Sequence, residues 1–443
     1  HIEESLESLK ITTIRGKVTL GGEGMTMKNI LLTPIFAAVE GAATIPEDVL
    51  GKLGYGLQIA VIGMLIVFAV LALIMGVLYS FEYFFYTLPN KAKKAPEAPK
   101  AEAPAANITK VALVTDVGTI DDESFNQACW QGVEAWCGAN GIEYTYYQPT
   151  EDSTDARVLS IAQAIAEGYN TIVMPGYLFG ATLTIVMEQY PDVNFIAVDV
   201  AAGDLTVDYA TYYEPAANTA CLTFSEEQAG YLAGYAAVKD GYTKLGFLGG
   251  MAVPAVIRYG YGFVQGADAA AAEMGTEIEI NYTYGGQFAG SPEITAKMEG
   301  WYQAGTEVVF ACGGGIYTSA LEAAEKNGGK IIGVDVDQSY ASDLVITSAV
   351  KGLKESVGKV LEQYYAGKWN TELSGKTQNL GAADDATGLP IETSRFTTFT
   401  AEQYNALFAQ IKSGAVAPKA EVPGDANNAD WLTGFEIVVV DFE

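Results

Sequence analysis

Short apolar runs alternate with longer stretches of helical periodicity along most of the chain after Thr109. The short runs predict strands at 110–115, 143–147, 171–174, 194–198, 209–213, 244–248, 277–284, 307–311, 330–334 and 344–347. The longer stretches predict helices at 124–139, 154–167, 181–189, 225–239, 256–274, 292–304, 317–327 and 351–366. Such alternation builds parallel sheets with right-handed crossovers. So many strands fit two doubly wound lobes, joined by a hinge, better than one small domain.

The two lobes are predicted to share the region 108–443. We place the first lobe at 108–224 plus 345–443 and the second at 225–344. After Gly367 the pattern becomes irregular, with one short helix near 401–412 and a final apolar strand within 431–440.

The first strand–helix unit, 111–132, carries candidate binding residues at a strand end. The strand reaches Asp116, and the following helix begins near Ser124, where Ser124 or Asp122 could cap it. Phe125 would face the same cleft from the first helical turn, because ligands of open α/β sheets bind outside the carboxyl ends of the strands. A carboxylate beside a flat ring suits a ligand with hydroxyls and a ring face. Asp116 could equally be a turn former and Phe125 a core residue.

Later strand ends and glycine-rich segments add further candidates. These are Asp199 and Asp335, each directly at the end of an apolar strand, Gly313 and Lys351, which follow two other strands, and the aromatic residues Tyr259 and Phe288. Structural alternatives stay open for several of them: a strand-end cap for Asp335, a solvated side chain for Lys351, a tight turn at Gly313 and core packing for Tyr259.

The run TDVGTIDDESFNQACWQG, residues 115–132, resembles the start of the basic membrane protein family of substrate-binding proteins. This family includes bacterial purine nucleoside receptors that feed transporters. The residues that match in register are Asp116, Gly118, Asp121, Asp122, Ser124, Phe125, Asn126 and Gly132. The resemblance covers about 108–395 and implies an α/β fold of the type I periplasmic-binding-protein class. It also implies binding without catalysis, cofactor or metal, with a purine nucleoside and ABC permease subunits as partners.

Receptors of this kind hold the purine base between two aromatic rings. The resemblance therefore assigns one ring to Phe125 and the other to Phe288, with Tyr259 as the alternative. Base–ring stacking contributes on the order of 1–3 kcal/mol per contact. The polar assignments that the resemblance implies are Asp116 and Asp199 to the base edge or ribose from the first lobe, Asp335 and Lys351 to ribose hydroxyls from the second, and Asn126 as an amide. Apart from the resemblance, the glycine at Gly313 would let the backbone approach a ligand closely.

An uncharged apolar segment, Leu57–Tyr79, precedes the alternating region. Its 23 residues would span roughly 34 Å as a helix, enough to cross a bilayer. We therefore predict one transmembrane helix at 57–79, after an N-terminal extension at 1–56 and before an Ala/Pro/Lys-rich linker at 80–107.

The same segment resembles the membrane helix of the gamma subunits of sodium-pumping decarboxylases. The run Gly63–Phe68, GMLIVF, carries this resemblance, which covers roughly 25–105. It leaves open a second function: an accessory subunit of such a pump, partnered by decarboxylase subunits, with a fused binding domain.

The charges that flank the apolar segment bear on its orientation. Lys91–Lys94 contribute three lysines after it, whereas Lys52 is the only close basic residue before it, so the positive-inside rule places the following domain in the cytoplasm. A receptor for uptake should instead face the outside of the cell membrane, and we expect the binding domain there. The sequence leaves both orientations open.

Composition narrows the possible functions. The net charge is −29, which disfavours nucleic acid and favours neutral or cationic small ligands. The only His is His1, which excludes Ser-His or Cys-His catalysis and histidine-ligated zinc. The four cysteines form no metal-binding motif and are expected to be buried: Cys129, Cys137, Cys221 and Cys312. A carboxylate-based hydrolase is the remaining enzymatic alternative, although no acidic cluster typical of one follows a strand.

Overall fold

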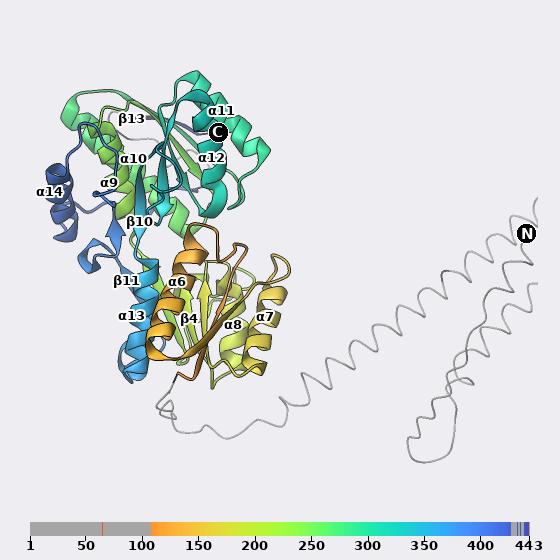
Figure 1. Ribbon diagram of the computed structural model, residues 1–443. Helices are drawn as coiled ribbons and strands as arrows, with labels where there is room; N and C mark the ends of the chain where they lie inside the picture. Colours follow the sequence, from red (N-terminus) through yellow and green to blue (C-terminus); the bar gives the residue numbers. More distant parts are fainter. Residues whose placement is uncertain (1–63, 65–107, 427–431, 433–434, 436–437, 443) are drawn as a thin grey trace, which may run out of the picture. The chain divides into compact units, whose positions relative to one another are not determined.

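The computed structural model describes residues 64, 108–426, 432, 435 and 438–442 (Figure 1). Met64 apart, the predicted extension at 1–56, transmembrane helix at 57–79 and linker at 80–107 lie outside these residues. No helix in the described part of the chain is long and apolar enough to cross a membrane. The transmembrane helix therefore stays a prediction.

The first of two sheets contains six parallel strands in the order β11-β5-β4-β3-β1-β2. They are β1 (Lys110–Val114), β2 (Glu143–Tyr147), β3 (Thr171–Pro175), β4 (Asn194–Val198), β5 (Thr219–Phe224) and β11 (Lys376–Leu380). One face packs against α6 (Phe125–Asn140) and α13 (Leu353–Tyr365), and the other against α7 (Thr154–Ala166) and α8 (Phe179–Gln189). Neighbouring strand residues point to opposite faces, so Val111 packs with α6 and α13 whereas Ala112 packs with α7 and α8.

The second sheet has the order β12-β10-β9-β8-β6-β7-β13 and is parallel except for the β10–β12 pair. Its strands are β6 (Lys244–Gly249), β7 (Ile278–Tyr284), β8 (Val308–Cys312), β9 (Lys330–Asp335), β10 (Val345–Lys351), β12 (Thr387–Gly388) and β13 (Val438–Phe442). One face packs against α9 (Glu226–Lys239), α10 (Pro254–Met274) and α14 (Ala401–Lys412), and the other against α11 (Pro292–Ala304) and α12 (Tyr317–Asn327). We call each sheet with its helices a lobe; the two lobes confirm the predicted fold of two parallel sheets.

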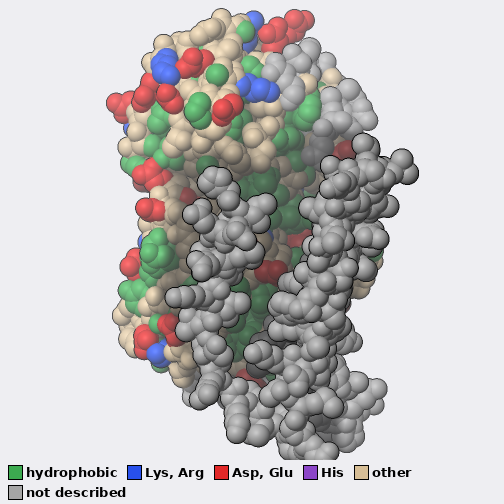
Figure 2. Space-filling view, turned by 90° about the vertical axis from the view of Figure 1, so that its right-hand side faces the viewer, with side chains coloured by type: hydrophobic (Ala, Val, Ile, Leu, Met, Phe, Trp, Pro, Cys, Tyr) green, Lys and Arg blue, Asp and Glu red, His purple; other side chains and the backbone are tan. Residues whose placement is uncertain are grey.

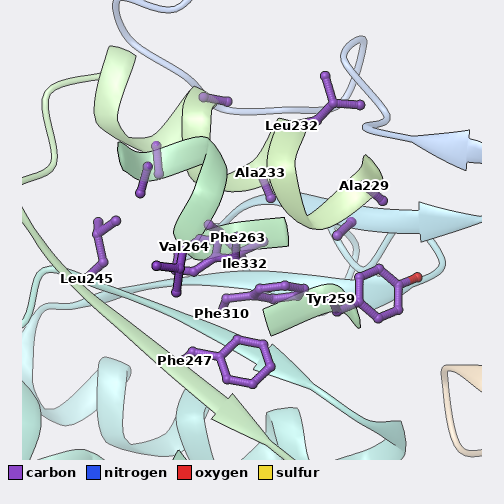
Figure 3. Close-up of a cluster of buried hydrophobic side chains, with 14 of the residues drawn as sticks. Ala229, Leu232, Ala233, Leu245, Phe247, Tyr259, Phe263, Val264, Phe310 and Ile332 are labelled. Carbon is purple, nitrogen blue, oxygen red and sulfur yellow. The ribbon is translucent and has the colours of Figure 1, made fainter. Parts of the chain in front are cut away.

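The core of the second lobe is rich in aromatic rings (Figure 3). Phe247 and Phe263 both meet Phe310, with ring centroids 5.4 Å apart in each pair. Tyr259, from α10, stands edge-on to Phe310 at 5.9 Å. The packed core thereby fixes the position of Tyr259 at one end of the sheet.

One predicted strand is wrong, and the strand that replaces it was not predicted. Residues 209–213 form no strand; a single antiparallel bridge joins Thr206 to Tyr212, and Asp208 holds the turn between them by accepting hydrogen bonds from the N–H groups of Ala210 and Thr211. The sheet strand is β5, ten residues further on. The tyrosines of 209–213 have strand propensity but are largely exposed, whereas β5 is almost wholly buried, and burial decides which segment joins the sheet.

The predicted lobe boundary near residue 345 also differs from the structure. Strands β10, β12 and β13 and helix α14 belong to the second lobe, and only α13 and β11 return to the first. The chain between 108 and 426 therefore crosses between the lobes three times, at Ser225, at Gly352 and at 381–386. Backbone hydrogen bonds link these hinge segments, from Ser225 N to Leu380 O at 2.9 Å and from Gly352 N to Ala386 O at 2.7 Å.

Glycines allow α9 and α10 to pack unusually closely. A Cβ atom at Gly230 or Gly234 would overlap the backbone of α10, and one at Gly262 or Gly266 would overlap the backbone of α9. The contact begins near the start of α9, so it fixes how Glu226, in the first turn of α9, meets Arg258, in the second turn of α10.

We expect Gly234→Ala to lower the free energy of unfolding by about 1–3 kcal/mol, because the new methyl group has to force the two helices apart. Urea unfolding followed by circular dichroism measures the change. The control is Gly300→Ala on α11, where an added Cβ atom meets nothing within 4 Å. That variant should be neutral or more stable by up to about 1 kcal/mol. Equal destabilisation of both variants would contradict the close-packing explanation.

Candidate functional site

A cavity of about 630 Å³ lies at the carboxyl ends of the strands, lined by residues of both lobes. All nine residues that the sequence predicts to bind ligand line it: Asp116, Phe125, Asn126, Asp199, Tyr259, Phe288, Gly313, Asp335 and Lys351. The fold therefore brings together side chains that are more than 200 positions apart in the sequence.

The loop before α6 is held by carboxylates. Asp116 Oδ1 accepts hydrogen bonds from Gly118 N at 2.9 Å and from Asn126 Nδ2 at 3.1 Å. Asp122, rather than Ser124, caps the helix: its oxygens accept from the N–H groups of Ser124, Asn126 and Gln127 at 2.9–3.1 Å. The hydroxyl of Ser124 is thus available to bond elsewhere.

Ser124 and its neighbour Glu123 connect the two lobes. Ser124 Oγ donates to Asp335 Oδ2 at 2.7 Å, and the Tyr317 hydroxyl donates to the carboxylate of Glu123. Gln338 Nε2 donates to the Glu123 carbonyl at 3.0 Å. Glu123 has a φ of 54°, a left-handed conformation that turns its carbonyl and carboxylate toward the second lobe. These bonds hold the lobes together beside the cavity.

Lys351, the last residue of β10, lies at the centre of a buried ionic cluster. Its ammonium nitrogen lies 2.5 Å from Asp199, 3.4 Å from Glu226 and 3.8 Å from Asp335. It also lies 4.7 Å from the ring centroid of Phe125. Burial by itself lowers the pKa of Lys351, but the three carboxylates outweigh burial and raise it, so the lysine stays charged. The cluster joins both lobes through one cation.

Three of the cavity carboxylates are strongly desolvated. Burial raises the pKa values of Asp116, Asp199 and Asp335, and Lys351 opposes the rise for Asp199 and Asp335. Asp199 and Asp335 both have positive φ angles, 60° and 66°, a conformation that Asp tolerates better than most residues. Each therefore turns sharply out of its strand at the edge of the cavity.

Three buried polar atoms on cavity residues have no hydrogen-bond partner among the described residues: Asn126 Oδ1, Asp199 Oδ1 and the Tyr259 hydroxyl. The first two can only accept a hydrogen bond. A buried acceptor without a donor costs free energy. The site thus suits a ligand that carries several hydrogen-bond donors.

Phe125 and Phe288 reach the cavity from opposite lobes, on α6 and on the loop after β7. Both rings are half-buried, whereas Tyr259 is only 1% exposed. Gly250 and Gly313 leave room for the Phe288 ring, because a Cβ atom on either would press against it. Gly313 therefore makes space for this ring, and its predicted close approach to a ligand stays a prediction.

Sequence reasoning missed Glu226 and Arg258. Glu226 is fully buried at the start of α9; its Oε2 accepts from Arg258 Nε at 2.6 Å, and its Oε1 lies 3.4 Å from Lys351. Arg258, on α10, lines the cavity. An acidic residue in a first helical turn is usually exposed, so no local pattern marks this one as buried.

Figure 2 shows one face, where acidic side chains are more widespread than basic ones. This agrees with the negative charge of the chain. The four cysteines are buried and free, as predicted. Among the described residues, no group of His, Cys, Asp or Glu side chains could hold a metal ion.

Two lobes of parallel sheet around a shared cavity define the periplasmic-binding-protein class. Solved structures share this fold: an ABC transporter solute-binding protein from Aeropyrum pernix K1 is 21% identical with a TM-score of 0.60, covering 70% of this chain and 92% of its own. Another solute-binding protein, from Conexibacter woesei DSM 14684, is 23% identical with a TM-score of 0.56, and the match covers 70% of this chain and 99% of the other. At these identities the likeness shows the fold alone.

The family model described as "ABC transporter substrate-binding protein PnrA-like" matches residues 108–418, and the chain belongs to this family. The ABC transporter nucleoside-binding protein BmpA of Lactococcus lactis is 29% identical over 283 residues, 59% of this chain and 76% of that protein. Basic membrane protein A1 of Borrelia garinii is 31% identical over 290 residues, which cover 64% of this chain and 80% of that protein. The basic membrane protein resemblance is thus confirmed. The match does not include 25–105, so the resemblance there to decarboxylase gamma subunits gains no support.

Glu227, next to Glu226, offers a test of how strongly this region is desolvated. Its Oε2 is buried without a partner among the described residues, and burial raises its pKa from 4.5 to about 7. The folded protein therefore holds this proton more tightly than the unfolded chain, and loses stability as the pH rises from about 4.5 through about 7.

We expect Glu227→Gln to be more stable than the wild type at pH 8, by on the order of 2–3 kcal/mol, and the difference to shrink toward pH 5. Urea unfolding across this pH range measures it. Glu134→Gln, at an exposed position on α6, is the control and should follow the wild-type pH dependence. A constant offset between Glu227→Gln and wild type at every pH would contradict the explanation.

Proposed function

We propose that this ABC transporter substrate-binding protein binds nucleosides, purine nucleosides first, in the cavity between its lobes. The observation that carries the proposal is the convergence of two aromatic rings and several acceptor groups on one cavity. The Lactococcus lactis relative is named a nucleoside-binding protein, which supports the same ligand class.

The two rings suit the flat faces of a purine base. Phe125 and Phe288 enter from opposite lobes and keep part of their surface accessible, which supports Phe288 over the buried Tyr259 as the second stacking ring. Because each lobe supplies one ring, a base can stack on both only when the lobes close around it. Binding would therefore favour hinge closure.

The polar groups suit a sugar diol and base N–H groups. Asn126 Oδ1 and Asp199 Oδ1 need donors, which ribose hydroxyls and a purine edge supply. Hydrogen bonds from hydroxyls to carboxylates are charge-assisted and strong. The ammonium of Lys351 donates to Asp199 and Glu226, so one of its three N–H groups remains for a ribose oxygen.

A substrate-binding protein of this family passes its small-molecule ligand to permease subunits. An uptake receptor meets its ligand outside the cell, so we place the binding domain on the extracellular side, against the orientation that Lys91–Lys94 favour. The predicted helix at Leu57–Tyr79 would tether it to the cell membrane.

Isothermal titration calorimetry of the full-length chain with adenosine, guanosine and inosine tests the ligand class. We expect at least one to bind, and chromatography should recover that nucleoside intact, as expected for binding without hydrolysis. A folded protein that binds none of the three would overturn the proposal, and release of free base would favour a hydrolase.

We expect Phe125→Ala to weaken nucleoside binding by about 1–3 kcal/mol, because one stacking contact is lost. The matched control is Tyr365→Ala, which removes an exposed ring at the end of α13 that does not line the cavity. Its affinity should equal that of the wild type. Calorimetry gives the affinities and thermal unfolding reports on folding; unchanged affinity in Phe125→Ala would exclude this ring as a ligand contact.

We expect Tyr317→Phe to weaken binding by about threefold to tenfold although Tyr317 does not line the cavity, because it removes a bond to Glu123 that joins the lobes. Most of the effect should appear as faster ligand dissociation, measured by stopped-flow fluorescence. Tyr302→Phe removes a hydroxyl bond to the Lys330 carbonyl within one lobe and serves as the control. Equal affinity in Tyr317→Phe and wild type would exclude a role for this contact in closure.

A further inference from the structure

Nucleosides and their 5′-monophosphates share a base and a sugar and differ by a phosphate that carries about −1.5 to −2 charges near pH 7. A site that binds both types of molecule needs a cation whose charge is available for the phosphate. Among the described residues that line the cavity, the cations are Arg258 and Lys351. The availability of these two charges therefore decides which type of ligand can enter.

One buried carboxylate balances both cations. Glu226 Oε2 accepts from Arg258 Nε at 2.6 Å, and Glu226 Oε1 lies 3.4 Å from Lys351 Nζ. The Glu226 side chain is 0% exposed, so water cannot easily replace either contact. Asp199 at 2.5 Å gives Lys351 a second carboxylate. Neither cation thus carries an unbalanced positive charge into the cavity.

The rest of the cavity repels an anion. Six carboxylates line it, Asp199 among them: Asp116, Asp122, Asp152, Asp199, Asp204 and Asp335. Bringing like charges together in a partly desolvated site strongly disfavours binding. The remaining N–H groups of Arg258 can still donate to neutral oxygen or nitrogen atoms of a base.

We propose that Glu226 is a specificity-determining residue, which makes the site accept nucleosides and reject their phosphorylated forms by balancing the charges of Arg258 and Lys351. This rests on the proposed function and adds to it a reason for selection between two metabolite classes. Selectivity here comes from a repulsive arrangement in addition to attractive contacts.

Calorimetry of the full-length chain with adenosine, guanosine and inosine, each paired with its 5′-monophosphate, tests the inference. The wild type should bind the monophosphate at least about a hundredfold more weakly than its nucleoside. In Glu226→Gln the ratio of nucleoside affinity to monophosphate affinity should narrow by about tenfold, because Arg258 gains an unbalanced charge that can pair with the phosphate. In the double variant Glu226→Gln with Arg258→Gln, this gain of monophosphate binding should disappear.

The matched control is Glu227→Gln, which makes the same chemical change one residue away, at a buried carboxylate that forms no ion pair with Arg258 or Lys351 among the described residues. Its ratio of nucleoside affinity to monophosphate affinity should change much less than that of Glu226→Gln, because Glu227 acts on Arg258 without a direct contact. If Glu226→Gln fails to fold, Glu226→Asp serves instead: it keeps the charge, but its shorter side chain cannot reach both cations, so the ratio should narrow by a smaller factor.

The outcomes separate the two proposals. If the wild type binds a nucleoside and also binds its monophosphate with an affinity within tenfold, the inference about Glu226 is overturned. The proposed function then remains intact. The inference about Glu226 is also overturned if the affinity ratio is unchanged in a folded Glu226→Gln variant. The same holds if the affinity ratio narrows equally in Glu227→Gln. Absence of binding by all three nucleosides overturns both proposals.

Discussion

The hinge and the cavity depend on the pairing of one buried cation, the Lys351 ammonium, with carboxylates from three parts of the chain. Asp199 follows β4 in the first lobe, Asp335 ends β9 in the second, and Glu226 begins α9 at a crossing between them. Buried charges are costly unless they are paired, so these segments can be buried together only in an arrangement that keeps the pairs. The cluster therefore contributes to a unique geometry more than to net stability.

Helix packing determines where this cluster lies. Gly230, Gly234, Gly262 and Gly266 let the backbones of α9 and α10 approach closely, next to Glu226 in the first turn of α9 and Arg258 in the second turn of α10. That approach brings Glu226 within hydrogen-bond distance of Arg258 and sets Tyr259 against the core ring of Phe310. Small residues on two apolar helix faces thus control the electrostatics of a polar cavity.

Much of the fold and the candidate site could be predicted from the sequence, because strand ends are visible in the apolar pattern. Asp116, Asp199 and Asp335 could be placed at one edge of the sheets from that pattern, and the family resemblance assigned roles to Phe125 and Lys351, which the pattern had also singled out. The predictions that failed concern features that depend on contacts between distant segments. Strand β5 was missed because a tyrosine-rich loop shows a stronger local signal, and the lobe boundary was misplaced because β10 precedes a crossing that no local pattern marks.

The loop between β1 and α6 explains how ligand contact and lobe closure can be coupled. Its carboxylate at Asp122 caps the helix, which leaves Ser124 and Glu123 to bond with the second lobe. Asp116 and Phe125, at the two ends of the same loop, line the cavity. A ligand that fixes either end restrains the residues between them, so binding and closure act on one short segment of backbone. Had Ser124 capped the helix, its bond to Asp335 would be lost, and the cavity side and the closure side of the loop would be independent.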